Sequence, residues 1–125
     1  MRENILPVKV YQNGKLQKSQ ILQENKNKSG IYRWTNLLNG KSYIGSSKII
    51  SSRLYSYYSE NTLKKSGSLI YKAILKYKHD NFSLEILEYC SPENRITREQ
   101  FYLDNCKHEY NICQIAGNKT GCKVS

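Results

Sequence analysis

The chain has 125 residues, enough for one domain with a modest hydrophobic core and too few for a second sizeable domain. Its 20 Lys and Arg residues against 10 Asp and Glu residues give a formal net charge of +10, which favours a polyanionic partner such as nucleic acid. The hydrophobic share of 38% argues against a disordered chain, and no apolar run reaches the length of a membrane-spanning helix. Charge alone does not separate DNA from RNA, or binding from cleavage.

Residues 1–28 are polar and rich in Lys, Gln and Asn, and we interpret them as a leader or linker. Residues 8–11 are good strand formers, and the apolar residues between Leu16 and Glu24 suggest a helix only loosely. No secretory signal or mitochondrial import pattern is visible here. The four cysteines and two histidines of the chain lack zinc-like spacing, so no structural zinc site is predicted.

A β-hairpin is predicted from residue 30 to residue 45. Residues 31–35 and 41–45 are rich in strand formers, and Asn39-Gly40 between them favours a two-residue type I′ turn. Such a turn would place Asn36 opposite Tyr43.

Side chains alternate between the two faces of a strand, so this register predicts two different hairpin faces. One face would carry Tyr32, Trp34, Asn36 and Tyr43. The other, more apolar face would carry Ile31, Thr35 and Ile44. A slip of one residue would separate the two tyrosines.

The remaining elements follow from hydrophobic periodicity and helix-start signals. They are helices over about 48–58, 68–78 and 91–105, a strand over 82–89, a loop over 59–67, and a short extended piece at 110–112. The pattern predicts an α+β domain in which a small three-stranded antiparallel sheet is flanked by helices.

Glu99 is the strongest candidate for chemistry that spacing alone supplies. It follows Ile96 by three residues and precedes Leu103 by four, which predicts a carboxylate on the core-facing stripe of its helix. A buried acid is costly unless it is paired or bound to a cation. Two interpretations stay open at this point, a cation-binding carboxylate and an ion pair with Arg95 or Arg98.

Arg53 lies on or beside the apolar stripe of the helix predicted over 48–58. It could extend to solvent, pair with an acid, or hold a phosphate with two parallel hydrogen bonds. Tyr32 and Tyr43 are ordinary strand tyrosines by propensity. A phenol has a reference pKa of about 10, so either would need that pKa lowered by nearby cations to act as a base near neutral pH.

The tripeptides Gly30-Ile31-Tyr32 and Tyr43-Ile44-Gly45, with ten residues between the tyrosines, resemble the two name-giving motifs of the GIY-YIG nuclease family. Arg53, Glu99 and Asn111 follow in the family's order, and the resemblance covers about residues 29–118. The sequence around the motifs is similar to group I intron homing endonucleases of fungal mitochondria.

The resemblance implies hydrolysis of DNA phosphodiester bonds with one divalent ion, Mg²⁺ or Mn²⁺. It implies that Tyr32 acts as the general base or positions the nucleophile, and that Tyr43 supports it and orients the phosphate or a metal-bound water. Arg53 would stabilise negative charge in the transition state.

The resemblance also assigns roles to three further residues. Tyr57 matches a position where the family has Tyr or His, Glu99 would bind the metal ion, and Asn111 would support the site by hydrogen bonding. The stretch Lys64–Ser68 contains no histidine, unlike some homing members, so proton transfer by histidine is not expected there.

The expected organisation is a leader or linker over 1–28, a catalytic domain over 29–118, and the start of a DNA-binding extension over 119–125. The resemblance implies a monomer in the mitochondrion that acts on double-stranded DNA and involves no membrane. Two alternatives stay open, a non-catalytic module that binds intron RNA or DNA, and a repair-type nuclease of the same family.

Overall fold

The computed structural model of the chain describes residues 6–65 and 68–111. Its centre is an antiparallel sheet with the strand order β1-β4-β2-β3. The strands are β1 (Lys9–Tyr11), β2 (Gly30–Asn36), β3 (Ser42–Ser47) and β4 (Phe82–Tyr89). The α+β prediction is confirmed, but the sheet has four strands instead of three because β1 joins its edge.

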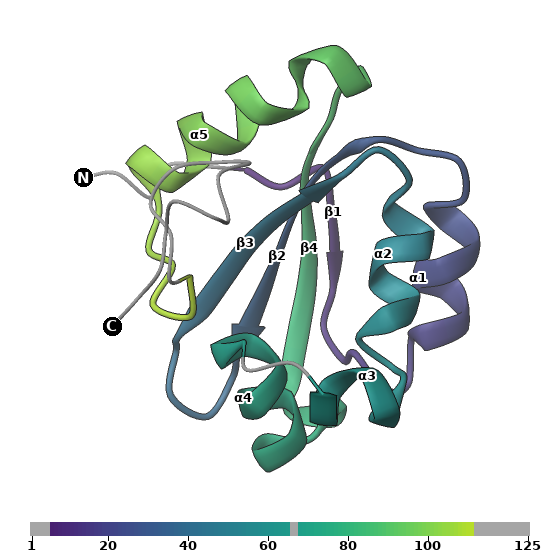
Figure 1. The fold of residues 1–125 in the computed structure, drawn as a ribbon, viewed down its shortest axis with the longest axis vertical. Helices are drawn as coiled ribbons and strands as arrows, with labels where there is room; N and C mark the ends of the chain where they lie inside the picture. The colour runs from purple at the N-terminus through teal and green to yellow at the C-terminus, as the bar shows by residue number, and fades with distance from the viewer. Residues whose placement is uncertain (1–5, 66–67, 112–125) are drawn as a thin grey trace.

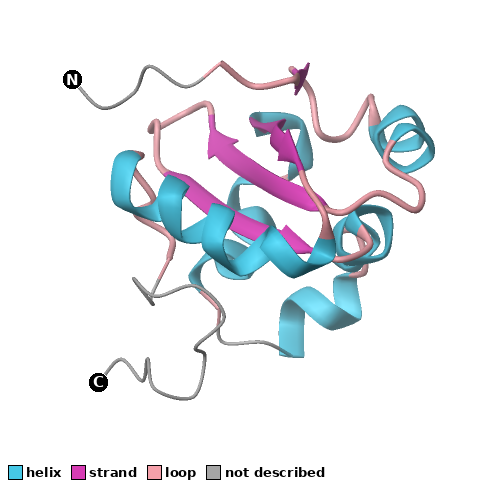
Figure 2. Cartoon of the chain, turned by 90° about the horizontal axis from the view of Figure 1, so that it is seen from above, coloured by secondary structure: helices cyan, strands magenta, loops and turns pink. Residues whose placement is uncertain are grey.

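Helices lie on both sides of the sheet (Figures 1 and 2). They are α1 (Lys18–Glu24), α2 (Ile50–Ser56), α3 (Glu60–Lys65), α4 (Leu69–Tyr77) and α5 (Arg95–Asn105), with short 3₁₀ turns at His79–Asn81 and Pro92–Asn94. Helix α5 lies across the sheet from α1 and α2. Within the described ranges, none of the helices has the length and apolar character needed to cross a membrane.

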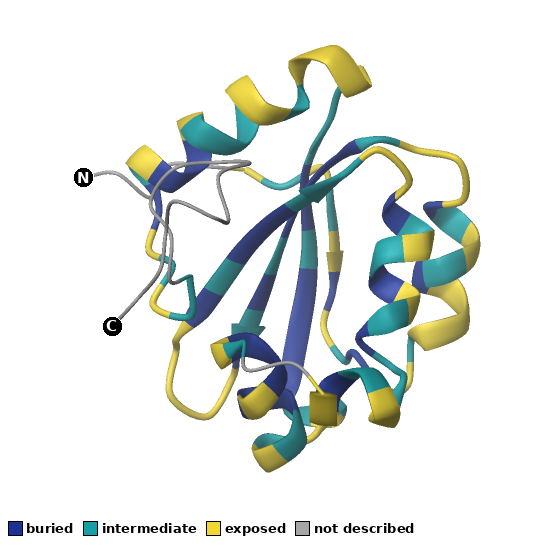
Figure 3. Cartoon of the chain, in the orientation of Figure 1, coloured by how far each residue is buried: buried dark blue, intermediate teal, exposed yellow. Residues whose placement is uncertain are grey.

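The two faces of the hairpin pack against different helices, as alternation predicts. Tyr32, Trp34 and Tyr43 belong to the larger core beneath α1, α2, α3 and α4. Ile31 and Ile44 belong to the smaller core beneath α5. In Figure 3 the central strands carry much of the dark blue that marks buried residues. The prediction that the two motif tyrosines share a face is therefore confirmed.

The predicted register of the hairpin is wrong by two residues. Tyr43 lies opposite Trp34 instead of Asn36, and a four-residue loop, 37–40, connects the strands. The Asn36 side chain accepts a hydrogen bond from the Leu38 backbone N–H, and Gly40 has a φ of 78°. This hydrogen bond and the glycine at a positive φ stabilise the longer loop. Because the shift is two residues, every side chain keeps its predicted face.

Residues 59–67, predicted as a loop, include helix α3. Leu63 is buried against the larger core, which gives this short helix its tertiary contact. Glu60 in its first turn, with Lys64 and Lys65 in its last, suits the helix dipole. The helices predicted over 48–58, 68–78 and 91–105 are confirmed as α2, α4 and α5, each of which is shorter than predicted.

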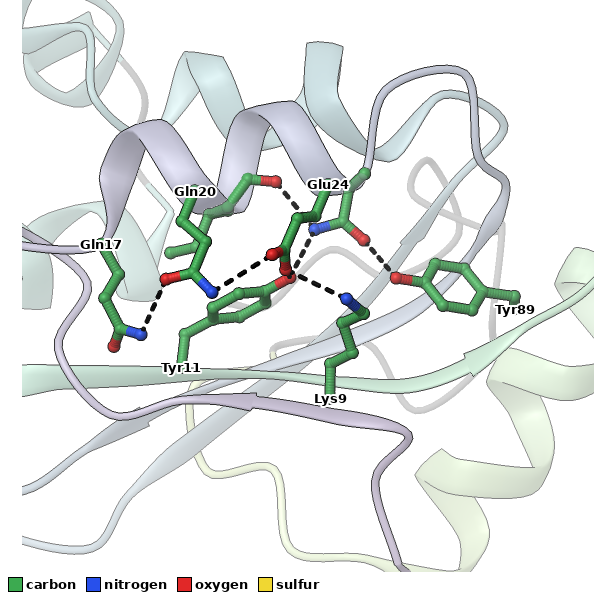
Figure 4. Close-up of polar contacts among 8 residues, drawn as sticks. Lys9, Tyr11, Gln17, Gln20, Glu24 and Tyr89 are labelled. Atoms are coloured by element: carbon green, nitrogen blue, oxygen red, sulfur yellow. Dashed lines mark hydrogen bonds and ion pairs between the residues drawn. The ribbon is translucent and has the colours of Figure 1, made fainter.

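Residues 9–24, which we interpreted as part of a leader or linker, belong to the fold. Strand β1 pairs with β4, and Tyr11 and Ile21 are buried in the larger core. Figure 4 shows how side chains join these elements. The Glu24 carboxylate accepts hydrogen bonds from the Tyr11 hydroxyl at 2.7 Å and the Lys9 ammonium at 3.0 Å. Tyr89 of β4 donates to the buried Asn25 amide oxygen at 2.6 Å.

Replacing Tyr11 with phenylalanine is expected to lower the melting temperature by a few degrees at pH 7, because the Glu24 carboxylate loses its buried donor. The hydrogen bonds from Tyr11 and then Lys9 lower the pKa of Glu24. Their stabilisation is present above the usual carboxyl pKa and disappears as the pH falls, so the difference should narrow in acid. Circular dichroism melts would measure it, with Tyr55→Phe at an exposed position as the control.

Candidate active site

The glycine of the second motif makes room for the tyrosine of the first. Gly45 lies directly opposite Tyr32 in the β2–β3 pair. A Cβ atom on Gly45 would lie 2.6 Å from the Tyr32 hydroxyl oxygen and 2.9 Å from Cε2 of Tyr43. The absence of a side chain therefore lets the Tyr32 ring lie across β3, one of the two edge strands of the sheet.

Replacing Gly45 with alanine is expected to reduce the free energy of unfolding by about 1–3 kcal/mol, because the new methyl group overpacks the two tyrosine rings. Urea denaturation would measure the loss. Gly40→Ala is the matched control, since it strains a residue with positive φ in open space. Nuclear magnetic resonance shifts at Tyr32 and Tyr43 should change only in the Gly45 variant; unchanged shifts would contradict this account of the glycine.

Three tyrosines and Arg53 form a compact cluster on this face. The hydroxyl groups of Tyr32 and Tyr57 are 2.9 Å apart, and the rings of Tyr32 and Tyr43 have centroids 6.5 Å apart. The Arg53 guanidinium lies over the Tyr57 ring at 5.4 Å and over the Tyr71 ring at 5.9 Å. Such cation–π contacts restrain a guanidinium without neutralising its charge.

Tyr57 is held in this cluster from two sides. It follows the last residue of α2, and its carbonyl oxygen accepts a hydrogen bond from His79 Nε2 at 2.7 Å. Its ring meets that of Tyr71, from α4, edge to face at 5.1 Å. Tyr57 therefore presents its hydroxyl to Tyr32 from a restrained position.

Burial governs the acid–base properties of the tyrosines. It raises the pKa of Tyr32, Tyr43 and Tyr57, and the positive charge of Arg53 offsets only part of that rise. The lowered pKa that a tyrosine base would need near neutral pH is therefore not found. Tyr32 is fully buried, whereas Tyr43 is only partly buried.

Glu99 approaches from the opposite side of the sheet. Its Oε1 accepts a hydrogen bond of 2.5 Å from the Ser46 hydroxyl, and Arg95 Nη1 donates to the same hydroxyl at 3.1 Å. Burial raises the pKa of Tyr43 and the charge of Arg53 lowers it; the third influence is the negative charge of Glu99, which raises it. The site therefore spans edge strand β3, with Glu99 on one side and the tyrosine–arginine cluster on the other, both acting on Tyr43.

The stripe predicted for α5 is partly wrong. Ile96 is 37% exposed, and the buried residues of the helix include Tyr102 and Leu103. Arg98, one of the two predicted partners of Glu99, instead forms two hydrogen bonds of 2.8 Å with Glu88 of β4. The buried face of α5 is therefore not the predicted stripe, and Glu99 lies half-buried at the rim of the smaller core.

Asn111 contacts the backbone of β3. Its amide oxygen accepts from the Ile44 N–H, and its amide nitrogen donates to the Ile44 carbonyl, both at 2.8 Å. The Tyr110 N–H also donates to the Ser42 carbonyl at 2.9 Å. Asn111 thus fixes the strand residue next to Tyr43. Residue 112, the end of the predicted extended piece, lies outside the described residues.

All six candidate residues from the sequence are placed around β3, and three further residues join them, of which the sequence had suggested only Arg95, as a partner of Glu99. Ser46 and Arg95 contact one another beside Glu99, and Tyr71 restrains Arg53. Strand alternation does place Ser46 on the face opposite Tyr43, but the sequence does not show which helix covers that face. Tyr71 lies between Ile70 and Ala73 of the apolar stripe in its helix and was not assigned to that stripe.

The oxygen groups at the site suit a hard divalent cation. Among residues 6–65 and 68–111, no group of three or more His, Cys, Asp and Glu side chains could hold a metal ion. A single carboxylate supplemented by water and substrate oxygen is a usual arrangement for Mg²⁺. Glu99, with one oxygen bonded to Ser46, fits that arrangement.

A small α+β domain that gathers tyrosines, an arginine and a carboxylate at a sheet edge offers groups for a phosphate and for a divalent cation, as a nuclease requires. The chain belongs to the GIY-YIG family, since the family described as the GIY-YIG catalytic domain matches residues 28–111. Strand β1 and helix α1 precede the matched region.

Two proteins of Neurospora crassa are similar in sequence. "Probable intron-encoded endonuclease 1" is 36% identical over 107 residues, covering 78% of this chain and 34% of that protein. "Probable intron-encoded endonuclease bI1" is 33% identical over 129 residues, covering 95% of this chain and 28% of that protein. The chain thus spans about a third of the length of these relatives.

Two solved structures of the catalytic domain of intron endonuclease I-TevI are similar in fold. A mutant form has a TM-score of 0.56 and 27% identity, covering 73% of this chain and 99% of that one. Another has a TM-score of 0.52 and 28% identity, covering 74% and 99%. The fold of a homing endonuclease catalytic domain, expected from the motifs, is confirmed.

Proposed function

We propose that the chain is the catalytic module of an intron-encoded homing endonuclease that hydrolyses DNA phosphodiester bonds with one divalent metal ion. The observation that carries this proposal is the placement of Arg53, beside the tyrosine cluster, and of Glu99, hydrogen-bonded to Ser46, on opposite sides of β3. A cationic group for the phosphate and a carboxylate for a metal ion are the minimum that such a reaction needs.

The distribution of charge supports a polyanionic partner. Residues 12–28 and 47–81, which contain α1 to α4, hold 11 Lys and Arg residues against 3 Asp and Glu residues. Residues 90–111, which contain α5, hold 3 against 4. The lysines of the first set are all exposed. A DNA backbone would therefore be attracted to the side of α1 to α4, where Arg53 lies.

Each site residue has a proposed task. Glu99 would hold Mg²⁺ or Mn²⁺, which when bound supplies positive charge to the phosphate and lowers the pKa of water. Arg53 would bind the phosphate oxygens and stabilise the charge that develops on them. Tyr43, the partly exposed tyrosine, would orient the phosphate or the attacking water.

The remaining residues support these contacts. Burial keeps the Tyr32 phenol protonated near neutral pH, which favours a positioning role for it over a general-base role. Tyr57 would hold the Tyr32 hydroxyl, and Asn111 would hold β3 beside Tyr43.

The wider setting is proposed from the same resemblance. We take residues 29–118 as the catalytic domain, with β1 and α1 packed against it, and 119–125 as the start of a DNA-binding extension. Because the Neurospora relatives are named as intron-encoded, a mitochondrial gene product that acts as a monomer on double-stranded DNA is our proposal.

A supercoiled-plasmid nicking assay tests the function. We expect nicking that requires Mg²⁺ and is lost in both Tyr32→Phe and Glu99→Ala. Salt-sensitive DNA retention without nicking, even after a DNA-binding extension is added, would favour a binding module instead. Preference for a damage-containing plasmid would favour a repair nuclease.

The positioning role of Tyr32 gives a separate prediction. Because burial raises its pKa, Tyr32 should not ionise below about pH 10, the reference value for a phenol. The absorbance of tyrosinate near 295 nm, taken as the difference between the unmodified chain and Tyr32→Phe, would follow this ionisation. A transition between pH 6 and 8 in the difference would restore the general-base role.

A further inference from the structure

The Ser46 hydroxyl lies between two charged groups beside the site. It is within hydrogen-bond distance of Glu99 Oε1, at 2.5 Å, and of Arg95 Nη1, at 3.1 Å. Ser46 directly follows the second motif in β3, and its backbone pairs with Ile31, on the face of the sheet that α5 covers. One side chain of the edge strand thus connects two positions, one turn apart, on α5.

The chemistry of the three groups fixes the direction of both hydrogen bonds. A guanidinium can only donate, so Arg95 occupies a lone pair of the Ser46 oxygen. The single hydroxyl proton must then point to Glu99 Oε1, because an ionised carboxylate can only accept. Charge-assisted hydrogen bonds of this kind are short and strong. The arrangement orients the carboxylate and assigns one of its oxygens to serine.

We propose that Ser46 is a positioning residue for Glu99, with Arg95 as the group that directs the serine proton. By holding Oε1, Ser46 restrains the orientation of the carboxylate that would bind the metal ion. This inference rests on the proposed function in so far as Glu99 binds a divalent ion.

The surroundings of Arg95 support the assignment. Its Nε is buried and has no hydrogen-bond partner among the residues that the structure describes. Arg95 therefore stays hydrogen-bonded to Ser46 although one of its buried N–H groups is left unpaired within the described ranges. The contact that this geometry preserves is the one to Ser46.

Four variants test the proposal through the Mg²⁺ dependence of nicking. Loss of a residue that orients a metal ligand usually reduces metal affinity or activity about 10–100-fold. Ser46→Ala should therefore raise the half-saturating Mg²⁺ concentration by about 10-fold or more. Ser46→Thr and Ser46→Val add the same methyl group and differ only in the hydroxyl, so threonine should keep the affinity that valine loses. Arg95→Leu should fall between Ser46→Ala and the unmodified chain.

A readout independent of cleavage separates this proposal from the proposed function. Bound Mn²⁺ should broaden the amide signals of residues 97–101 in the ¹⁵N-labelled chain, and Ser46→Val should reduce that broadening while Ser46→Thr does not. Equal broadening in both variants would overturn the positioning role and leave the nuclease function standing. Absence of broadening in the unmodified chain would overturn the metal role of Glu99, and this proposal with it. A serine-dependent effect without any nicking would support the positioning role and refute the function.

Discussion

Replacing Glu99 with alanine is expected to reduce Mg²⁺-dependent nicking by on the order of 1,000-fold, since a bound metal ion contributes several kcal/mol of transition-state stabilisation. The fold should survive, because Glu99 lies at the rim of the smaller core and Ser46 keeps its contact with Arg95. Single-turnover nicking rates and thermal melts of the same preparations would measure both effects.

Two control variants make the result specific to the carboxylate charge. Glu99→Gln keeps an oxygen that can accept from Ser46, yet it should be nearly as inactive as alanine because a neutral amide binds Mg²⁺ poorly. Glu88→Gln weakens the paired hydrogen bonds to Arg98 on the same helix and should affect stability more than nicking. A large loss of melting temperature in Glu99→Ala with activity retained would support the structural ion-pair interpretation.

Replacing Arg53 with alanine is expected to lower the nicking rate by about 100–1,000-fold, the usual effect of removing a group that stabilises transition-state charge. The guanidinium is restrained over the Tyr57 and Tyr71 rings, so it meets the phosphate without first losing conformational freedom. Single-turnover rates at saturating Mg²⁺ would measure the effect.

Arg53→Lys is the informative control, because lysine keeps the positive charge but cannot form the two parallel hydrogen bonds of a planar guanidinium. We expect Arg53→Lys to recover only a small part of the rate. Arg53→Met keeps much of the packing against Tyr57 and should have a melting temperature near that of the unmodified chain. A full recovery with lysine would contradict the bidentate contact and leave only a requirement for positive charge.

The part of the site that the sequence predicted depends on local rules. Strand alternation placed Tyr32 and Tyr43 on one face, and it did so correctly despite a register error of two residues. Helical spacing likewise placed Arg53 beside the core. The motif resemblance then supplied the order of Glu99 and Asn111 along the chain.

The parts that the sequence did not predict depend on tertiary contacts. Strand β1 has only three residues, and its place in the sheet depends on pairing with β4 and on the Tyr11–Glu24 contact. The exposure of Ile96 shows that the orientation of α5 is set by its packing on β3. Periodicity within one helix cannot specify that orientation.

The two hydrogen bonds between Asn111 and Ile44 also bear on how the molecule avoids self-association. An edge strand with free N–H and C=O groups can pair with a strand of another molecule, and β3 is such an edge. Asn111 occupies both polar groups of Ile44 with one side chain. The backbone is thereby closed to intermolecular sheet extension at the centre of β3.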